Sequence, residues 1–491
     1  MRTMFALLAL GVMACGPEKD DTGDGPEADA DTDADADTDA DADSDADADG
    51  DTDVGPGDGC EEGAIPEAWP EVIDDVEVHL AWGGWNAALG DVNGDGYDDI
   101  ALDDALVLLG PLCPGLDPDD EDLIHADLVV PSGYGYQHLR GAGDVDGDGL
   151  ADILVGDEGD YRTTGEVFLA LSPIEGEAYL PDIADAEIVG ETVRGYLGGA
   201  VAGVGDVDGD GVPDLLAGAK YEEGGGAAWL ISGTTRGYHT ISEVGVAIRG
   251  SSASPTVGWR LAALGDTDGD GLDDFLVGTS SAIESPGVAL VRGPVVADLA
   301  FEDADAVFLP HPDDEVYGGA FGAAFSGAGD QDGDGLPEIV ISAPWTTQYG
   351  DSDGAVFIFD GVATGQIDPT ESRSVIVGER DCAAGWGVGL AGDVDGDGQT
   401  DLAIGDPGWN EADGHYVGAF YIILGVAPEG VVPLATADVR VVGTYDGHSV
   451  DLGYDIVGAG DTNGDGLEDV LVSGWMQHGG EYYHSHLLLG R

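Results

Sequence analysis

The sequence predicts an all-β fold, a seven-bladed β-propeller of four-stranded antiparallel blades. Three observations predict this fold. An acidic nine-residue motif recurs at spacings of 53, 62, 60, 64, 63 and 68 residues, its seven copies opening at Asp91, Asp144, Asp206, Asp266, Asp330, Asp393 and Asp461. Each motif is flanked by short apolar runs of strand length and composition. Each repeat holds two further apolar runs, which gives four strands in about 60 residues.

The first two strands of each repeat are expected to flank the motif directly. The preceding strand has Asn86 five positions before the first motif, and an apolar residue there in the later copies: Leu139, Val201, Leu261, Phe325, Val388 and Ile456. The following strand starts right after position nine, as Ile100–Leu102, Ile153–Val155, Leu215–Ala217, Phe275–Val277, Ile339–Ile341, Leu402–Ile404 and Val470–Val472. This excludes the EF-hand, whose loop runs to a Glu at position twelve between two helices. The motif therefore connects two neighbouring antiparallel strands.

The third and fourth strands complete each blade. Gly354–Phe359 is an example of the third strand and Ala186–Val189 of the fourth. The seventh copy ends after its third strand, His484–Leu489, while a spare strand, Val76–Leu80, precedes the first copy. We expect the spare strand to complete the last blade, which leaves no open sheet edge.

The motif itself has the composition of a calcium-binding loop. Positions one, three and five are always Asp or Asn, position six is always Gly, and position nine is Asp or, once, Glu338. Calcium takes six to eight oxygen ligands. A curling chain can offer side chains at one, three and five, a backbone carbonyl at seven and a carboxylate at nine, while Gly at six tolerates positive φ. Position seven is mostly apolar, which fits a carbonyl ligand whose side chain points into the core.

These positions define the candidate calcium ligands. Plain Asp/Gly turns are the alternative interpretation, and seven copies in register argue against it. We expect up to seven structural, non-catalytic Ca²⁺ ions, held by Asp91, Asn93, Asp95, Tyr97, Asp99, Asp144, Asp146, Asp148, Leu150, Asp152, Asp206, Asp208, Asp210, Val212, Asp214, Asp266, Asp268, Asp270, Leu272, Asp274, Asp330, Asp332, Asp334, Leu336, Glu338, Asp393, Asp395, Asp397, Gln399, Asp401, Asp461, Asn463, Asp465, Leu467 and Asp469.

The N-terminal part of the chain has the pattern of a targeting segment and a linker. Residues 1–14 form a basic and then apolar signal sequence, and the stretch that ends at Cys15 resembles the bacterial lipobox, which implies a lipid on Cys15. Residues 15–62 form an Asp/Ala-rich segment that should be extended and disordered. Ordinary cleavage that removes Cys15, and a mineral-binding role for the linker, are the alternatives. Residues 70–491 hold the seven repeats.

The charge of the chain excludes some classes of partner. Its 491 residues include 14 Lys and Arg against 100 Asp and Glu, which gives a net charge of −86. Nucleic acids and anionic lipid surfaces are bound by Lys/Arg patches, so neither is expected as a partner. We expect contact with a membrane through the lipid anchor only, and a location outside the cytoplasm, at the bacterial outer membrane or cell surface.

Because of these repeats, the chain resembles the FG-GAP repeat family. This family includes the calcium-binding propellers of integrin α subunits and many bacterial surface proteins. The Phe-Gly element is visible as Phe321-Gly322, and the Gly-Ala-Pro element as Ser342-Ala-Pro344 and Gly405-Asp-Pro407. The resemblance covers about residues 72–491. It implies a propeller stabilised by calcium and a role in binding or adhesion.

Aromatic residues mark a candidate ligand face opposite the motifs. Five of them fall 14–17 residues beyond the first Asp of their own repeats: Tyr161, Tyr221, Trp345, Trp409 and Trp475. Exposed aromatics on rigidly held loops often anchor sugars or cationic side chains. The alternative is that each ring packs over the end of its own blade.

Two smaller groups of residues are weaker candidates. His484 and His486 share a strand face and would lie near His79 if the ring closes as expected, which predicts either a zinc site or a satisfied structural cluster. Cys60 and Cys113 flank the first repeat and could form a disulfide, although Cys382 leaves three pairings open.

The sequence favours a binding protein over an enzyme. It contains no nucleophile elbow, His-Glu-x-x-His helix or phosphate-binding loop. The leading hypothesis is a lipid-anchored, calcium-binding surface module for a glycan or protein partner. The alternatives are an extracellular polysaccharide hydrolase or lyase on a propeller scaffold, and a purely structural envelope protein.

Overall fold

The computed structural model divides the chain into two compact units, Met1–Asp58 and Gly59–Arg491. It describes residues 78–80, 86–102, 106–113, 125–129, 137–174, 176, 178–252, 254–281, 286–314, 317–331, 333–349, 354–379, 383–410, 417–443, 451–478 and 480–491. The predicted signal sequence, Cys15 and the linker lie outside the described residues.

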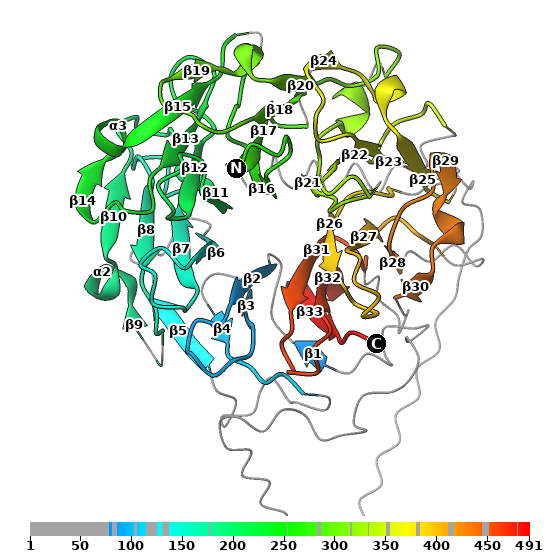
Figure 1. Ribbon diagram of the computed structural model, residues 1–491, viewed down its shortest axis with the longest axis horizontal. Helices are drawn as coiled ribbons and strands as arrows, with labels where there is room; N and C mark the ends of the chain where they lie inside the picture. The colour runs from blue at the N-terminus through cyan, green and yellow to red at the C-terminus, as the bar shows by residue number, and fades with distance from the viewer. Residues whose placement is uncertain are drawn as a thin grey trace, which may run out of the picture. The chain divides into compact units, whose positions relative to one another are not determined.

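Seven antiparallel sheets are arranged around a central axis in the second unit, which confirms the predicted seven-bladed propeller (Figure 1). Blade 1 contains β2 (Asn86–Gly90), β3 (Asp99–Leu102), β4 (Leu106–Leu108) and β5 (His125–Val129). Blade 2 contains β6 (Gln137–Gly143), β7 (Asp152–Asp157), β8 (Glu166–Ala170) and β10 (Ala186–Val189). Blade 3 contains β11 (Leu197–Gly205), β12 (Asp214–Ala219), β13 (Ala227–Ile231) and β15 (Gly245–Arg249).

The remaining blades follow the same order. Blade 4 contains β16 (Arg260–Gly265), β17 (Asp274–Gly278), β18 (Val288–Val291) and β20 (Ala306–Phe308). Blade 5 contains β21 (Phe325–Gly327), β22 (Ile339–Ala343), β23 (Ala355–Phe359) and β25 (Ser374–Val377). Blade 6 contains β26 (Val388–Gly392), β27 (Asp401–Asp406), β28 (Ala419–Ile423) and β30 (Val439–Val442). Blade 7 contains β31 (Asp455–Gly460), β32 (Asp469–His478) and β33 (Gly480–Leu488).

The ring closes as the sequence predicted. Strand β1 (Val78–Leu80) pairs antiparallel with β33 and is the fourth strand of blade 7, with Val78 opposite Leu487 and Leu80 opposite Ser485. The innermost strands contact one another in the order β2, β6, β11, β16, β21, β26 and β31, and β31 contacts β2 again. The first and last blades are therefore joined both at the axis and within one sheet.

Five blades have a fifth strand, so the prediction of four strands per blade was incomplete. These outer strands are β9 (Ala178–Tyr179), β14 (Gly237–Thr240), β19 (Leu299–Ala300), β24 (Gly365–Ile367) and β29 (Gly430–Pro433). Each comes from the following repeat and pairs parallel with the fourth strand of the preceding blade, as β14 does with β10. They are two to four residues long and largely exposed, so they carry no alternating apolar pattern.

A short helical turn follows each outer strand and buries its first residue. These turns are α2 (Leu180–Ile183), α3 (Ile241–Val244), η3 (Phe301–Asp303), η5 (Pro369–Glu371) and η6 (Leu434–Thr436), whereas η4 (Tyr317–Ala320) precedes β21. Leu180, Ile241 and Leu434 are at most 1% exposed, so the turns close the outer side of the blades.

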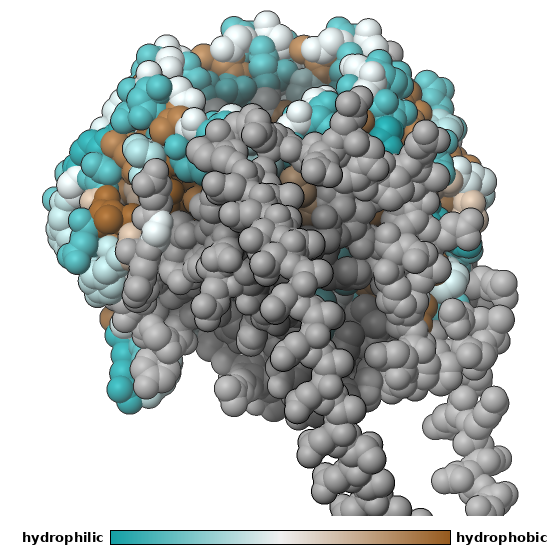
Figure 2. Space-filling model, turned by 90° about the horizontal axis from the view of Figure 1, so that it is seen from below, coloured by the Kyte–Doolittle hydropathy of each residue, from teal (hydrophilic) through white to brown (hydrophobic). Residues whose placement is uncertain are grey.

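The apolar core lies between neighbouring blades. One buried cluster joins Leu154 and Leu169 of blade 2 to Leu215 and Trp229 of blade 3. Another joins Ile100 of blade 1 to strands of blade 7. Burial of each such side chain stabilises the fold by about 1.5–3 kcal/mol. On the visible described part of the surface, hydrophobic residues occur in small groups between hydrophilic ones (Figure 2).

Candidate metal centres

The seven acidic motifs all connect the first strand of a blade to the second, as predicted. The second motif, for example, joins β6 to β7, and its position nine, Asp152, is the first residue of β7. Since every blade uses the same connection, the seven loops lie on one face of the propeller. We call this the loop face, and the opposite side the far face.

The Asp at position one organises the loop through backbone N–H groups. In the second loop the Oδ1 atom of Asp144 accepts a hydrogen bond from the Gly147 N–H at 2.7 Å, and its Oδ2 atom accepts one from the Gly149 N–H at 2.9 Å. Gly147 and Gly149 both have positive φ, +79° and +97°. Glycine is therefore required at position four as well as at position six.

The carboxylate at position nine has a second role that sequence reasoning missed. Asp152 is only 1% exposed, and its two oxygens accept hydrogen bonds from the N–H groups of Val145 and Ser172, both at 2.8 Å. Val145 lies in the loop, and Ser172 lies beyond the third strand. The same clamp recurs in the other loops, for example with Asp401 between Val394 and Gly425.

Burial changes the proton affinity of these clamping carboxylates. It raises the pKa of Asp99 and Asp469 to about 7, and that of Asp214 and Asp401 to about 6, although backbone hydrogen bonds act in the opposite direction. Repulsion from neighbouring loop carboxylates contributes to these raised pKa values. A bound cation would oppose this effect by favouring the charged form.

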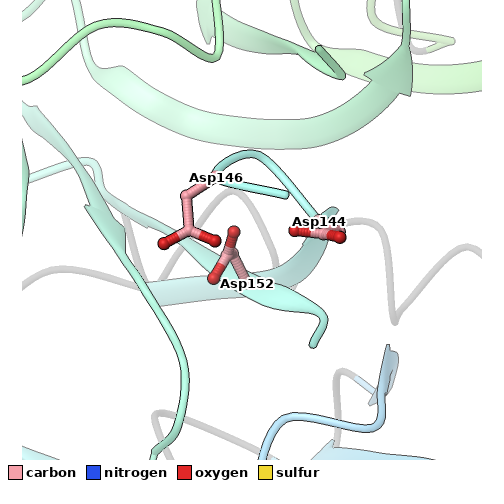
Figure 3. Close-up of side chains that lie close together, drawn as sticks. All are labelled: Asp144, Asp146 and Asp152. Atoms are coloured by element: carbon pink, nitrogen blue, oxygen red, sulfur yellow. The ribbon is translucent and has the colours of Figure 1, made fainter. Parts of the chain in front are cut away.

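Carboxylate oxygens converge in four of the loops. Asp144, Asp146 and Asp152 offer oxygens within 4.8 Å of one another and gather at the turn between β6 and β7 (Figure 3). The same distance limit holds in three other loops, for Asp206, Asp208 and Asp210, for Asp266, Asp268 and Asp274, and for Asp393, Asp395 and Asp401. All donors are hard oxygens, which suit Ca²⁺ better than a soft metal.

One orphaned atom supports a cation in the sixth loop. The Oδ1 atom of Asp393 is buried and has no hydrogen-bond partner in the described structure. A buried charged oxygen without a partner costs free energy. A divalent ion among Asp393, Asp395 and Asp401 would compensate this oxygen, so these residues fit the predicted metal.

The other three loops share the fold of the motif. In the first and seventh loops the amide oxygens of Asn93 and Asn463 accept hydrogen bonds from the N–H groups of Asp95 and Asp465, at 2.9 and 2.8 Å. In the fifth loop Asp332 lies outside the described residues, while Glu338 is buried and clamps the Gln331 N–H. The ligand assignment in all seven loops remains a prediction.

The side chains at position seven only partly follow the expectation that they point into the core. Val212 packs against the core cluster of blades 2 and 3 as expected, whereas others lie against a neighbouring loop. Leu150 is half-buried and lies against Gly94 of the preceding loop. A Cβ atom added to Gly94 would lie 3.2 Å from the Cδ2 atom of Leu150. Tyr97 in the same way covers Gly464 of the seventh loop. In these copies the position-seven side chain packs between neighbouring loops, because the chain turns along the loop face at this point.

Position eight links the loops to one another. The Asp98 N–H donates to the Asp461 carbonyl at 3.1 Å, and the Asp98 Oδ2 atom accepts from the Asp461 N–H at 2.9 Å. The Asp273 N–H likewise donates to the Asp206 carbonyl at 2.9 Å. The first pair joins loop one to loop seven, so it also strengthens the closure of the ring.

The predicted aromatic residues of the far face do not form one set. Tyr161 and Tyr221 are 53% and 38% exposed, whereas Trp345 is half-buried beside Trp386 at a centroid distance of 5.9 Å. Trp409 packs against the core cluster of blades 5 and 6, as the alternative interpretation held. The side chain of Trp475 lies outside the described residues.

The weaker candidates are only partly visible. His79 lies opposite His486 in the β1–β33 register, and His484 is two residues away on β33. The zinc site remains a prediction. Cys113 is disulfide-bonded. Its partner lies outside the described residues, as do Cys60 and Cys382, so the predicted pairing remains a prediction too.

Comparison with known proteins agrees with this architecture. A family model described as "FG-GAP repeat" matches residues 198–231 and 384–423, which cover the three inner strands and the acidic loops of blades 3 and 6. The chain contains FG-GAP repeats. Their arrangement as an integrin-alpha-like propeller agrees with the resemblance seen in the sequence.

Integrin alpha subunits are among the curated relatives of this FG-GAP repeat chain. Integrin alpha-4 of Xenopus laevis is 28% identical over 266 residues, which are 52% of this chain and 23% of the relative. Integrin alpha-5 of Xenopus laevis is 28% identical over 57% of this chain and 27% of the relative. Integrin alpha-IIb of Homo sapiens is 31% identical over 34% of this chain and 16% of the relative. The chain thus spans about a quarter of the first two relatives.

Proposed function

We propose that this chain is a binding or adhesion module outside the cytoplasm, tethered by a lipid on Cys15 and stabilised by calcium in its FG-GAP loops. The observation that carries the proposal is the set of converging carboxylates on the loop face, with the orphaned Asp393 oxygen among them. A rigid metal-held propeller leaves the far face free to present binding residues. The likeness to integrin alpha subunits supports the same class of function.

Calcium in this proposal has a structural role. The residues at positions one, three, five and nine would hold the ion with oxygen ligands, and the carbonyl at position seven would complete the shell. The ion would supply positive charge that offsets repulsion among carboxylates. The polypeptide itself sets the loop conformation through the N–H groups bound to position one and position nine.

Tethering through Cys15 is a separate part of the proposal. None of the helices among the described residues is long and apolar enough to span a membrane. A labelled fatty acid should be incorporated into the wild-type chain and not into the Cys15→Ser variant. Incorporation in both, or in neither, would reject the anchor.

The binding function can be tested with the full chain carrying Cys15→Ser, which removes the acylated residue. The protein is applied with calcium to arrays of glycans and of surface proteins, and bound glycans are then checked for shortening. Saturable binding without turnover supports the proposal. Shortened products would favour the polysaccharide-active enzyme, and the absence of any ligand would favour an architectural role.

A further inference from the structure

Three of the few basic residues of the propeller lie near one half-buried histidine, His138. Residues 60–491 contain 12 Lys and Arg against 81 Asp and Glu. Burial, together with the positive charges of Arg140, Lys220 and Arg260, lowers the pKa of His138 to about 3. Three cations therefore lie within electrostatic reach of one neutral histidine.

Innermost strands of different blades carry Arg140, Arg260 and Asp455, whereas Lys220 directly follows β12. Arg140 is on β6, Arg260 is the first residue of β16, and Asp455 is the first residue of β31. Asp455 of blade 7 interacts electrostatically with Arg140 of blade 2 and with Arg260 of blade 4. The strands that carry them, β6, β16 and β31, belong to the ring of innermost strands that surrounds the central axis (Figure 1). We call Arg140, Lys220, Arg260 and Asp455 the axial cluster.

The axial cluster lies toward the far face. Each innermost strand runs toward its acidic loop, so residues near the start of the strand are distant from the loop. Arg260 precedes Asp266, the first residue of its loop, by six positions, and Asp455 precedes Asp461 by six. At about 3.3 Å per residue this separates Arg260 and Asp455 from the loop face by roughly 20 Å. Arg140 precedes Asp144 by four positions, roughly 13 Å, and so lies nearer the middle of the axis.

The cations of the axial cluster are unevenly paired. The Lys220 Nζ atom pairs with Glu158 Oε2 at 2.5 Å. Neither Arg140 nor Arg260 forms an ion pair in the described structure. The Arg140 Nη1 atom donates a hydrogen bond to the Leu139 carbonyl at 2.6 Å. Among these residues three cations face two carboxylates. A third carboxylate, Asp451, lies within electrostatic reach of Tyr454, so the opportunity for an anion comes from the two guanidinium groups without an ion pair and not from an excess of positive charge.

Both arginines are in addition partly removed from water. Each is half-buried, and burial lowers the pKa of both guanidinium groups. A desolvated guanidinium without a carboxylate partner is costly, and a bound anion would relieve this cost with charge-assisted, bidentate hydrogen bonds. The arrangement is therefore suited to an anionic ligand.

Aromatic rings surround these cations. The Lys220 Nζ atom lies 5.1 Å from the ring centroid of Trp259, and Trp259 is 6.3 Å from Tyr221. Tyr454, which precedes Asp455, is 5.5 Å from Trp386 and lies within electrostatic reach of Arg260. Sugar rings stack their C–H faces on such side chains. Trp259 and Tyr454 are half-buried and so still offer accessible ring surface.

We propose that the axial cluster binds a carboxylate of an acidic glycan, a chain that contains uronate sugars, with Trp259 and Tyr454 beside the sugar ring. A uronate joins a carboxylate to a ring with an apolar face, which matches guanidinium groups next to aromatic rings. An acidic peptide offers the carboxylate without a ring, so it is the less suitable ligand. The inference rests on the proposed binding function and names its ligand class.

The test measures binding of oligogalacturonate to the full chain carrying Cys15→Ser, in saturating calcium, by calorimetry. A neutral galacto-oligosaccharide of equal length and a poly-glutamate of equal charge are the comparison ligands. We expect Arg140→Gln and Arg260→Gln each to lose at least tenfold in affinity, as removal of a charge-assisted hydrogen bond does. Asp455→Asn should bind the uronate more tightly, because it removes a competing negative charge.

The matched control is Arg249→Gln. Arg249 is an arginine with a 43% exposed side chain, which stacks over Trp229 at 4.7 Å and pairs with Asp298 at the outer strand pair β15–β19. It should bind like the parent chain. Each variant must show the parent melting temperature in calcium, and Asp455→Asn provides a change of opposite sign that misfolding cannot produce.

The outcomes separate this inference from the proposed function. Equal affinity for the neutral oligosaccharide or for poly-glutamate, or unchanged affinity in both arginine variants, overturns the uronate site. If another glycan or protein still binds, the proposed function stands without it. If no ligand binds in calcium, both fail.

Discussion

Removal of calcium should lower the melting temperature of the chain by about 10 °C. The expected size follows from linkage, because an ion that binds only the folded state stabilises it by RT ln(1 + [L]/Kd). With about 5 mM calcium and a Kd on the order of 10⁻⁴ M, each site contributes about 2.3 kcal/mol. The four loops with converging carboxylates together contribute about 9 kcal/mol.

Coulomb repulsion gives a similar magnitude. Two charges 4.8 Å apart repel each other by about 0.9 kcal/mol in water and by about 3.5 kcal/mol at an effective dielectric constant of 20. Three pairs per loop therefore cost roughly 3–10 kcal/mol before backbone N–H groups reduce the repulsion. A unit of roughly 430 residues has an unfolding entropy of about 0.9 kcal/mol/K, so 9 kcal/mol corresponds to about 10 °C.

The assay is differential scanning calorimetry of the full chain in calcium, in excess chelator, and in chelator followed by calcium. Magnesium is the control, because its small octahedral shell fits a flexible oxygen loop poorly and should restore less stability. A melting temperature that is the same in calcium and in chelator would refute the reasoning. Equal rescue by magnesium would refute the assignment to calcium.

Three further predictions concern protons, the clamp and ring closure. The folded-state pKa values of Asp99 and Asp469 are raised to about 7. Their contribution to the stability of the folded state is therefore complete below about pH 4 and is lost as the pH rises through 7. The metal-free chain, desalted after chelation, should therefore melt at a higher temperature at pH 5 than at pH 8; the opposite order would contradict the assignment. Asp401→Ala leaves the Val394 and Gly425 N–H groups unpaired and should destabilise the metal-free chain by roughly 2–6 kcal/mol in denaturant titrations, while Asp401→Asn, which keeps one acceptor, should lose less. A chain that begins at Trp82 lacks β1 and should unfold less cooperatively than one that begins at Gly59, and identical transitions would show that the strand does not close the ring.

The features that repeat in the sequence were predictable, because the same physical constraint acts in every blade. The period and the apolar runs give the blade number, and the missing fourth strand of blade 7 predicts the role of β1. The spacing of Asp residues predicts the loops, since carboxylates at alternate positions converge only if the chain curls around a centre.

The features that were missed depend on contacts between blades. The outer strands such as β14 pair with a sheet of another repeat, and Tyr238 within it is 65% exposed, so no local pattern marks it. Arg140 and Arg260 are isolated charges in apolar strands, separated by 120 residues, and only closure of the ring brings them near Asp455. Isolated charges within predicted inner strands were the signal that could have found the axial cluster.

The innermost strands connect the two candidate sites physically. Strand β6 carries Arg140 and ends one residue before Asp144, and β16 carries Arg260 and ends one residue before Asp266. Strain in an acidic loop must therefore act on the strand that positions an axial arginine. Because the loops are also hydrogen-bonded to one another through position eight, as Asp98 is to Asp461, a cation in one loop helps to hold the neighbouring blade. Calcium on the loop face would thus preorganise the axial cluster without any contact with its ligand, which is the physical requirement for coupling between two separate sites.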